Sequence, residues 1–177
     1  MRKFTLLGLT GCLCACGVIP KEDISPVNTL AATAILKHNN LPAGTATLAQ
    51  SGANIALAVN VSGLNDGTYA MHLHQTGKCE GPDYKTAGPH WNPGNRQHGL
   101  NNPQGAHGGD LPNLTVTGGG SARYSGVIPG ILLTGAAGLM DADGAAFIIH
   151  AKADDGTTDP SGNSGDRIIC GVLTLGK

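Results

Sequence analysis

Aromatic and charged residues are scarce in this chain of 177 residues. Phe, Trp and Tyr together make up 3% of the sequence, so Val, Ile, Leu and Ala must fill the core. Charged residues make up 13%, against about 25% in a typical soluble domain, and the formal net charge is −1. This composition excludes a coiled coil, a basic nucleic-acid-binding protein and an acidic disordered chain.

Glycine is abundant instead, with 28 residues, about twice the usual ~7%. The glycines follow no three-residue period, which excludes a collagen-like chain. The length fits one domain. Abundant glycine with few helix formers favours many short strands joined by loops.

The N-terminus has the pattern of an export signal. Met1–Lys3 is a short positive segment, and the apolar run Phe4–Thr10 is far shorter than the ~20 residues that span a membrane. The run ends in Leu9-Thr10-Gly11-Cys12, which resembles the bacterial lipobox, where the cysteine is lipidated and becomes the new N-terminus. An ordinary cleaved signal or a disordered start is the alternative.

If the lipobox interpretation is correct, the chain has three parts. We expect residues 1–11 to be a lipoprotein signal peptide, residues 12–28 a lipidated tether and residues 29–177 the folded domain. The protein would then face the periplasm, anchored to a membrane of the bacterial envelope by lipid on Cys12.

The five cysteines are Cys12, Cys14, Cys16, Cys79 and Cys170. If Cys12 carries lipid, Cys79 and Cys170 are the obvious structural pair, because an exported chain sits where disulfides persist. Cys14 and Cys16 are left unexplained: they are either spare cysteines near the anchor or a Cys-x-Cys metal pair.

Short runs rich in β-branched and small apolar residues, bounded by Gly, Pro, Asn or Ser, predict strands. These runs are Thr29–Lys37, Gly44–Ala49, Asn54–Val61, Thr68–His74, Thr115–Thr117, Ala122–Ile128, Ala145–Ala151 and Ile168–Leu173. The segments Gln75–Asn113 and Asp154–Asp166 lack a strand pattern, and loops that long are usually functional. We therefore predict an all-β Greek-key barrel or sandwich of about eight antiparallel strands with two long functional loops.

Two histidines share one face of a predicted strand. His72 and His74 are two residues apart, and residues at that spacing point to the same side of a strand. His150 ends another predicted strand. The surplus of imidazoles over one metal suggests a second ion, and four nitrogens suit Cu(II).

The first long loop carries His90, His98 and His107, followed by Asp110. Three histidines and one carboxylate are a tetrahedral zinc set by ligand type. An incidental histidine-rich loop and a site for a single metal are the alternatives.

Four segments in this order resemble bacterial copper/zinc superoxide dismutases. They are Gly63–His74, Ala87–Pro93 followed by His98-Gly99, His107–Leu111 and Gly162–Val172. The similarity extends over roughly Thr29 to Gly176, and the position of Cys79 five residues after His74 resembles the bacterial members. Ala70 and Met71 depart from the family's usual glycine and phenylalanine, and we expect no loss of metal binding from them.

The resemblance implies a role for each motif residue. Copper ligands would be His72, His74, His90 and His150, and zinc ligands His90, His98, His107 and Asp110, so that His90 bridges the two ions. Asp154 would link His72 to His98, Arg167 would bind the substrate anion beside copper, and Cys79–Cys170 would be the family's disulfide.

The implied activity is dismutation of superoxide to dioxygen and hydrogen peroxide, with one copper and one zinc per chain, protecting the cell envelope. The alternatives are a periplasmic copper-sequestering lipoprotein of the same fold and a structural lipoprotein held together by zinc. Lys78, Lys85 and Arg96 in the first loop are candidates for steering the anion. We expect no nucleic-acid partner. The sequence is compatible with either a monomer or a homodimer.

Overall fold

Nine β-strands and one short 3-10 helix form the regular structure of residues 29–176, the part of the chain that this computed structural model describes. No helix in this part has the length and apolarity to cross a membrane. The predicted signal peptide, the tether and Cys12, Cys14 and Cys16 lie outside the described residues. The elements are β1 (Ala31–His38), β2 (Leu41–Ser51), β3 (Asn54–Ser62), β4 (Gly67–Tyr69), β5 (Met71–His74), η1 (Lys85–Ala87), β6 (Leu114–Val116), β7 (Ser121–Pro129), β8 (Ala146–His150) and β9 (Arg167–Leu175).

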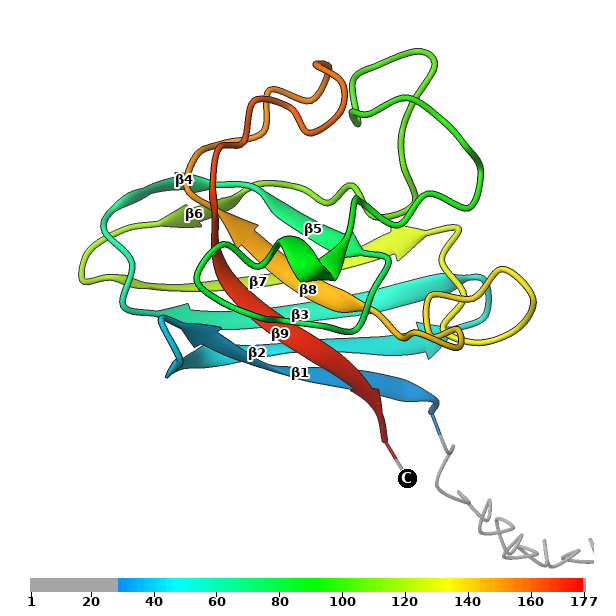
Figure 1. The fold of residues 1–177 in the computed structure, drawn as a ribbon, viewed down its shortest axis with the longest axis horizontal. Coiled ribbons are helices and arrows are strands. Elements are labelled where there is room, and N and C mark those ends of the chain that lie inside the picture. Colours follow the sequence, from blue (N-terminus) through cyan, green and yellow to red (C-terminus); the bar gives the residue numbers. More distant parts are fainter. Residues whose placement is uncertain (1–28, 177) are drawn as a thin grey trace, which may run out of the picture.

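The strands form a large sheet in the order β5-β8-β9-β1-β2-β3-β7 and a small sheet of β4 and β6, with antiparallel pairing throughout. β4 leads into β5 and β6 leads into β7, so the small sheet connects the two edges of the large one (Figure 1). Strands distant in sequence, such as β1 and β9, lie side by side, as in a Greek key. The predicted all-β fold is confirmed.

One of the predicted strands is divided into two strands in the structure. The run Thr68–His74 breaks at Ala70, which separates β4 from β5. The backbone of Ala70 bonds instead with the segment after β8: its N–H donates to Lys152 O, and its carbonyl accepts from the N–H of His150. The chain thus crosses from the small sheet to the large one immediately before His72. The other seven predicted runs each match one strand.

Most strands bury one face, as the alternation predicts. In β3 the burial alternates along the whole strand, and Ile55, Leu57, Val59 and Val61 enter the core. β5 and β8 are buried at every residue. Their second face must therefore be covered by something other than the core.

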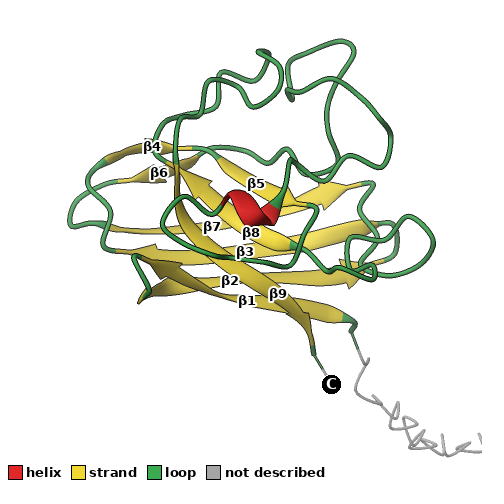
Figure 2. Ribbon diagram, viewed as in Figure 1, coloured by secondary structure: helices red, strands yellow, loops and turns green. Residues whose placement is uncertain are grey.

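The first long loop supplies that cover, because its Tyr84 and Ala87 pack with Ala146 and Ile148 of β8. Its backbone pairs with the free edge of β5: the N–H of Leu73 donates to Gly109 O, and the N–H of Trp91 donates to Leu73 O. A disulfide between Cys79 and Cys170 joins the start of this loop to β9. The second long loop rises on the same side of the sheet, and its Gly156 carbonyl accepts from the N–H of Asn101 (Figures 1 and 2). The space between sheet and loops holds the site.

Candidate metal centre

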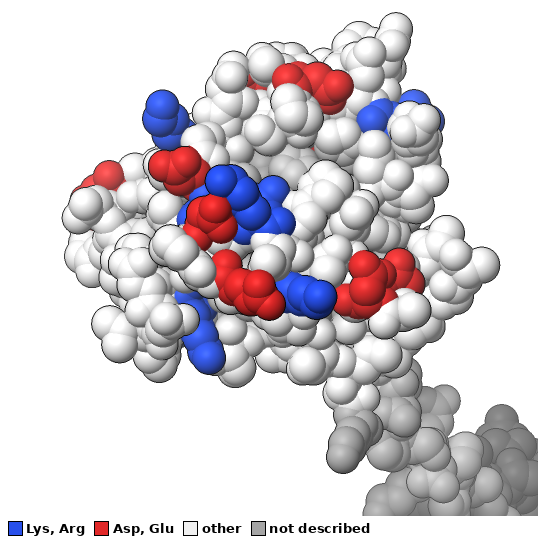
Figure 3. Space-filling model, in the orientation of Figure 1, with Lys and Arg blue, Asp and Glu red and all other residues white. Residues whose placement is uncertain are grey.

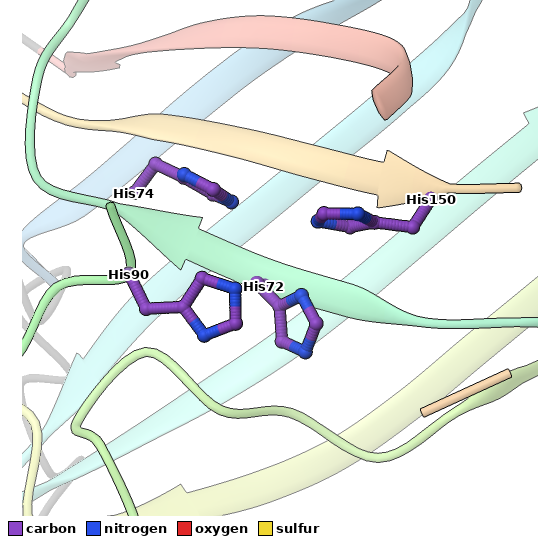
Figure 4. A group of neighbouring side chains, drawn as sticks. All are labelled: His72, His74, His90 and His150. Atoms are coloured by element: carbon purple, nitrogen blue, oxygen red, sulfur yellow. The ribbon is translucent and has the colours of Figure 1, made fainter. Parts of the chain in front are cut away.

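Four histidine side chains converge between β5, β8 and the first long loop (Figure 4). β5 carries His72 and His74, β8 ends in His150, and His90 lies in the loop. Their potential ligand nitrogens all lie within 4.8 Å of one another, and each side chain is buried. The β5 edge positions the loop residue directly, because His74 and His90 form an isolated antiparallel bridge.

One nitrogen of each ring is buried without a hydrogen-bond partner. These atoms are His72 Nδ1, His74 Nε2, His90 Nε2 and His150 Nε2. A single unsatisfied buried polar atom costs about 1–3 kcal/mol, so four lone pairs directed at one point need a ligand to offset them. Four imidazole nitrogens are donors that suit Cu(II). The residues present therefore fit copper.

The opposite nitrogen of three rings has a fixed partner. His74 Nδ1 donates to Gly88 O at 2.8 Å, His150 Nδ1 donates to Gly165 O at 3.1 Å, and His72 Nε2 lies 2.7 Å from an Asp154 oxygen. Such bonds fix the tautomer of a ligating histidine and turn its free lone pair toward the metal.

The predicted zinc ligands meet at Asp110. Its Oδ1 lies 2.9 Å from His90 Nδ1, 3.0 Å from His98 Nδ1 and 3.2 Å from His107 Nδ1. Zn–N bonds of about 2.0–2.1 Å in a tetrahedron place neighbouring ligand atoms about 3.3 Å apart. The buried His98 Nδ1 makes no aligned hydrogen bond. This donor set fits zinc.

His107 is the loosest member of this set. The potential ligand atoms of His72, His90, His98 and Asp110 all lie within 4.8 Å of one another, and His107 is not a member of that cluster. Its Nδ1 still lies 3.4 Å from His90 Nδ1, so it faces the same point. His90 therefore has one nitrogen in each set, as expected for a bridging ligand.

The family model described as "Copper/zinc superoxide dismutase (SODC)" matches residues 42–173. The Cu-Zn superoxide dismutase of Caulobacter vibrioides is 38% identical over 147 residues, covering 80% of this chain and 84% of that protein. The chain belongs to the copper/zinc superoxide dismutase family.

Two further matches, one a sequence and one a crystal structure, are named only as superoxide dismutase-like, and both come from Bacillus subtilis. The superoxide dismutase-like protein YojM is 49% identical over 105 residues, covering 58% of this chain and 54% of that relative. The crystal structure of a superoxide dismutase-like protein from the same organism superposes with a TM-score of 0.77 at 36% identity, covering 80% of this chain and 97% of that one.

In this family member, Asp154 connects the two metal sets. Its carboxylate lies 2.7 Å from His72 Nε2 and 3.0 Å from His98 Nε2, which is the link that the resemblance implied. The side chain of Asn113 holds the backbone of Asp154 from both sides: its amide donates to Asp154 O and its oxygen accepts from Asp154 N–H, each at 2.9 Å. No local sequence pattern indicates the role of Asn113, because its partner is 41 positions away.

Arg167 is held beside the copper set by two carbonyl groups. Its Nη1 donates to Tyr84 O at 2.8 Å and its Nη2 donates to Gly88 O at 2.7 Å. Gly88 O also accepts from His74, so one carbonyl connects the guanidinium to a histidine that could hold copper. The role of Tyr84 could not be predicted from the sequence either. Its ring is buried with Cys170, and its backbone is left-handed, with φ of 51°.

Burial favours the neutral form of the four histidines that converge between β5, β8 and the first long loop. Burial lowers the pKa of His74 to about 2, of His150 to about 3 and of His90 to about 4. Burial also lowers the pKa of His72, although its bond to Asp154 acts in the opposite direction. Neutral imidazole is the form that binds a metal.

The zinc side is electrostatically different. Burial favours neutral His98, but its contacts with Asp110 and Asp154 outweigh burial and raise its pKa to about 9. Burial likewise acts to raise the pKa values of Asp110 and Asp154, and hydrogen bonds from the histidines hold both well below the ordinary range. A metal can bind at His98 Nδ1 only when that nitrogen carries no proton.

Ala70 and Met71, the two departures from the family pattern, do not enter the site. Both are fully buried, and Met71 packs in the main core on the face of β5 opposite His72. His38, the seventh histidine, ends β1 and belongs to neither metal set.

Proposed function

We propose that this protein dismutates superoxide in the bacterial cell envelope, so that two superoxide ions and two protons give dioxygen and hydrogen peroxide. The main support is the four buried, unpartnered imidazole nitrogens beside the fixed guanidinium of Arg167. Family membership supports the same activity.

The histidines divide into two holding sets. His72, His74, His90 and His150 would hold copper, and His98, His107 and Asp110 would join His90 in holding zinc. Bound copper supplies the one-electron chemistry, which oxidises one superoxide to dioxygen and reduces the next to peroxide. The residues of the zinc set would hold an ion that has no redox chemistry, so its role would be structural.

Arg167 binds the anion. Its guanidinium has five N–H groups, and the bonds to Tyr84 and Gly88 account for two donors. The remaining N–H groups can form charge-assisted hydrogen bonds to superoxide. Because the guanidinium is already held in place, little reorganisation is needed when the anion arrives.

His90 is the proton donor for the second half of the reaction. Its Nδ1 lies 2.9 Å from Asp110 on the zinc side, whereas its Nε2 faces the other histidines without a protein partner. Nε2 is therefore the atom at which this side chain could take up a proton when it does not hold copper, and pass it to superoxide as that ion is reduced; the second proton of hydrogen peroxide would come from water.

Lys85 is the steering cation that the structure favours. It lines a cleft of about 510 Å³ together with Arg167, and Lys78 and Arg96 are not among the residues of that cleft. Its ammonium lies 2.9 Å from exposed Asp83, which reduces its field without cancelling it. Figure 3 shows basic side chains near acidic ones on this face, so any attraction for an anion is local.

Envelope location rests on the N-terminal pattern alone. The positive Met1–Lys3, the short apolar run and Gly11-Cys12 support export followed by lipidation of Cys12. Mass spectrometry of the mature protein from the membrane fraction tests this. A diacylated Cys12 is expected, and an unmodified N-terminus at another residue would contradict it.

A copper-binding protein with little turnover is the second candidate. The observation in its favour is the name "superoxide dismutase-like" carried by the relative at 49% identity. The anion-binding arrangement at Arg167 favours the enzyme, because storing copper requires no substrate anchor.

Metal content and dismutase activity, measured on the purified mature chain, test the proposal. The enzyme should hold about one copper and one zinc per chain and remove superoxide, whereas copper without dismutation would support storage. His150→Ala should abolish turnover and leave zinc bound, because His150 belongs to the copper set alone. Loss of both metals in that variant would contradict the division into two sets.

A further inference from the structure

The second long loop contributes no ligand to either proposed metal set, yet it contacts the segment around His98 at three points. The Asp154 carboxylate lies 3.0 Å from His98 Nε2, and Gly156 O accepts from Asn101 N–H at 2.9 Å. The third contact is between Asp159 and the main chain: Asp159 Oδ1 accepts from the N–H of His98 at 2.6 Å. We propose that Asp159 is a positioning residue that sets the orientation of the zinc ligand His98.

Two carboxylates from different loops hold two consecutive amides. The N–H of His98 donates to Asp159, and the next N–H, that of Gly99, donates to Asp110 Oδ2 at 2.9 Å. Gly99 has φ of +114°, in the region that glycine adopts more readily than other residues. Fixing both amides fixes the backbone on both sides of the His98 α-carbon. The fixed backbone sets the direction in which the His98 side chain leaves the main chain, and the contacts of Nδ1 with Asp110 and of Nε2 with Asp154 then orient the ring.

The hydrogen bond to the His98 amide depends on the Asp159 side chain itself, and not only on the negative charge of the second long loop. Asp155, in the same loop, bonds within the loop, accepting from the N–H groups of Thr157 and Thr158. Asp159 instead reaches across to a residue 61 positions away, and a short bond from an amide to a carboxylate is among the stronger hydrogen bonds. Residues that hold a metal ligand in place typically affect metal affinity by about 10–100-fold.

The test compares three variants of the full mature protein. Asp159→Ala removes the acceptor, Asp159→Asn keeps an acceptor oxygen without the charge, and Asp166→Ala removes an equal charge from the same loop away from His98. Zinc retention is measured by competition with a chelator. We expect about tenfold faster zinc release in Asp159→Ala, partial rescue in Asp159→Asn and no change in Asp166→Ala.

A second readout separates positioning from general loop stability. Co²⁺ placed in the zinc set has d–d absorption bands that depend on ligand geometry. Asp159→Ala should shift these bands, and Asp159→Asn should largely restore them. Unchanged bands and zinc retention equal to those of Asp166→Ala would overturn the proposal, even if the melting temperature falls.

This inference rests on the zinc half of the proposed site and not on turnover. If the wild-type protein binds zinc but fails to dismutate superoxide, the proposed function fails and the role of Asp159 is still measurable. If wild-type zinc binding is normal and the variants match it, Asp159 has no positioning role and the proposed function stands.

Discussion

At the scale of single residues, the position of Asp154 depends on a neighbour that makes no contact with a metal ligand. Asn113 forms two hydrogen bonds with the backbone of Asp154, and the Asp154 carboxylate then joins His72 to His98. Such a neutral hydrogen bond contributes about 1 kcal/mol. The link between the proposed copper and zinc sets therefore depends on an exposed amide at the end of the first long loop.

Asn113→Ala should lower the free energy of unfolding by about 1–2 kcal/mol, because two hydrogen bonds are lost. Chelator-induced zinc loss should also become faster, since Asp154 is then free to move. Calorimetry and a zinc-release assay measure the two effects. Thr115→Ala, at a nearby exposed position of β6, is the matched control. Zinc release as slow as in this control would show that Asp154 holds its position without Asn113.

At the scale of elements, the sequence predicted the strands that carry ligands better than the loops that orient them. The alternation in β5 places His72 and His74 on one face, and the structure confirms it. The break at Ala70 escaped prediction, because it depends on hydrogen bonds to His150 and Lys152. The contacts of Asn113, Tyr84 and Asp159 could not be predicted from the sequence for the same physical reason. Each contact joins segments that are far apart in sequence, and no local period or motif marks it.

The disulfide couples the first long loop to the anion site. Cys79 and Cys170 are joined across 91 residues, and Cys170 packs with Tyr84, whose carbonyl holds Arg167. Cys79→Ser should lower the free energy of unfolding by about 4–5 kcal/mol, the chain-entropy value for a loop of this length. Denaturant unfolding measures this loss.

The same variant should also bind the small anion azide more weakly, because the carbonyl groups around Arg167 are less firmly held. Unchanged azide binding in a destabilised variant would separate the disulfide from the anion site.

At the scale of the whole molecule, the low charge content limits long-range attraction of a substrate anion. With 11 basic and 12 acidic residues in the full sequence, net charge gives no driving force, and the few cations near Arg167 matter individually. A unit charge about 10 Å from an anion in water contributes about 0.4 kcal/mol, roughly a factor of two in rate. Lys85, in the same cleft as Arg167, is placed to provide that contribution.

Lys85→Gln should therefore lower kcat/KM about twofold at low ionic strength and make the rate less sensitive to salt, because a screened attraction has been removed. Lys78→Gln and Arg96→Gln are the matched controls, since both remove one positive charge from the same loop outside that cleft. Rates measured by pulse radiolysis over a range of ionic strength distinguish the three variants. Equal effects in all three would show that superoxide responds to the loop's total charge. No effect in any of them would place the attraction at Arg167 itself, whose guanidinium is half-buried and less screened by salt.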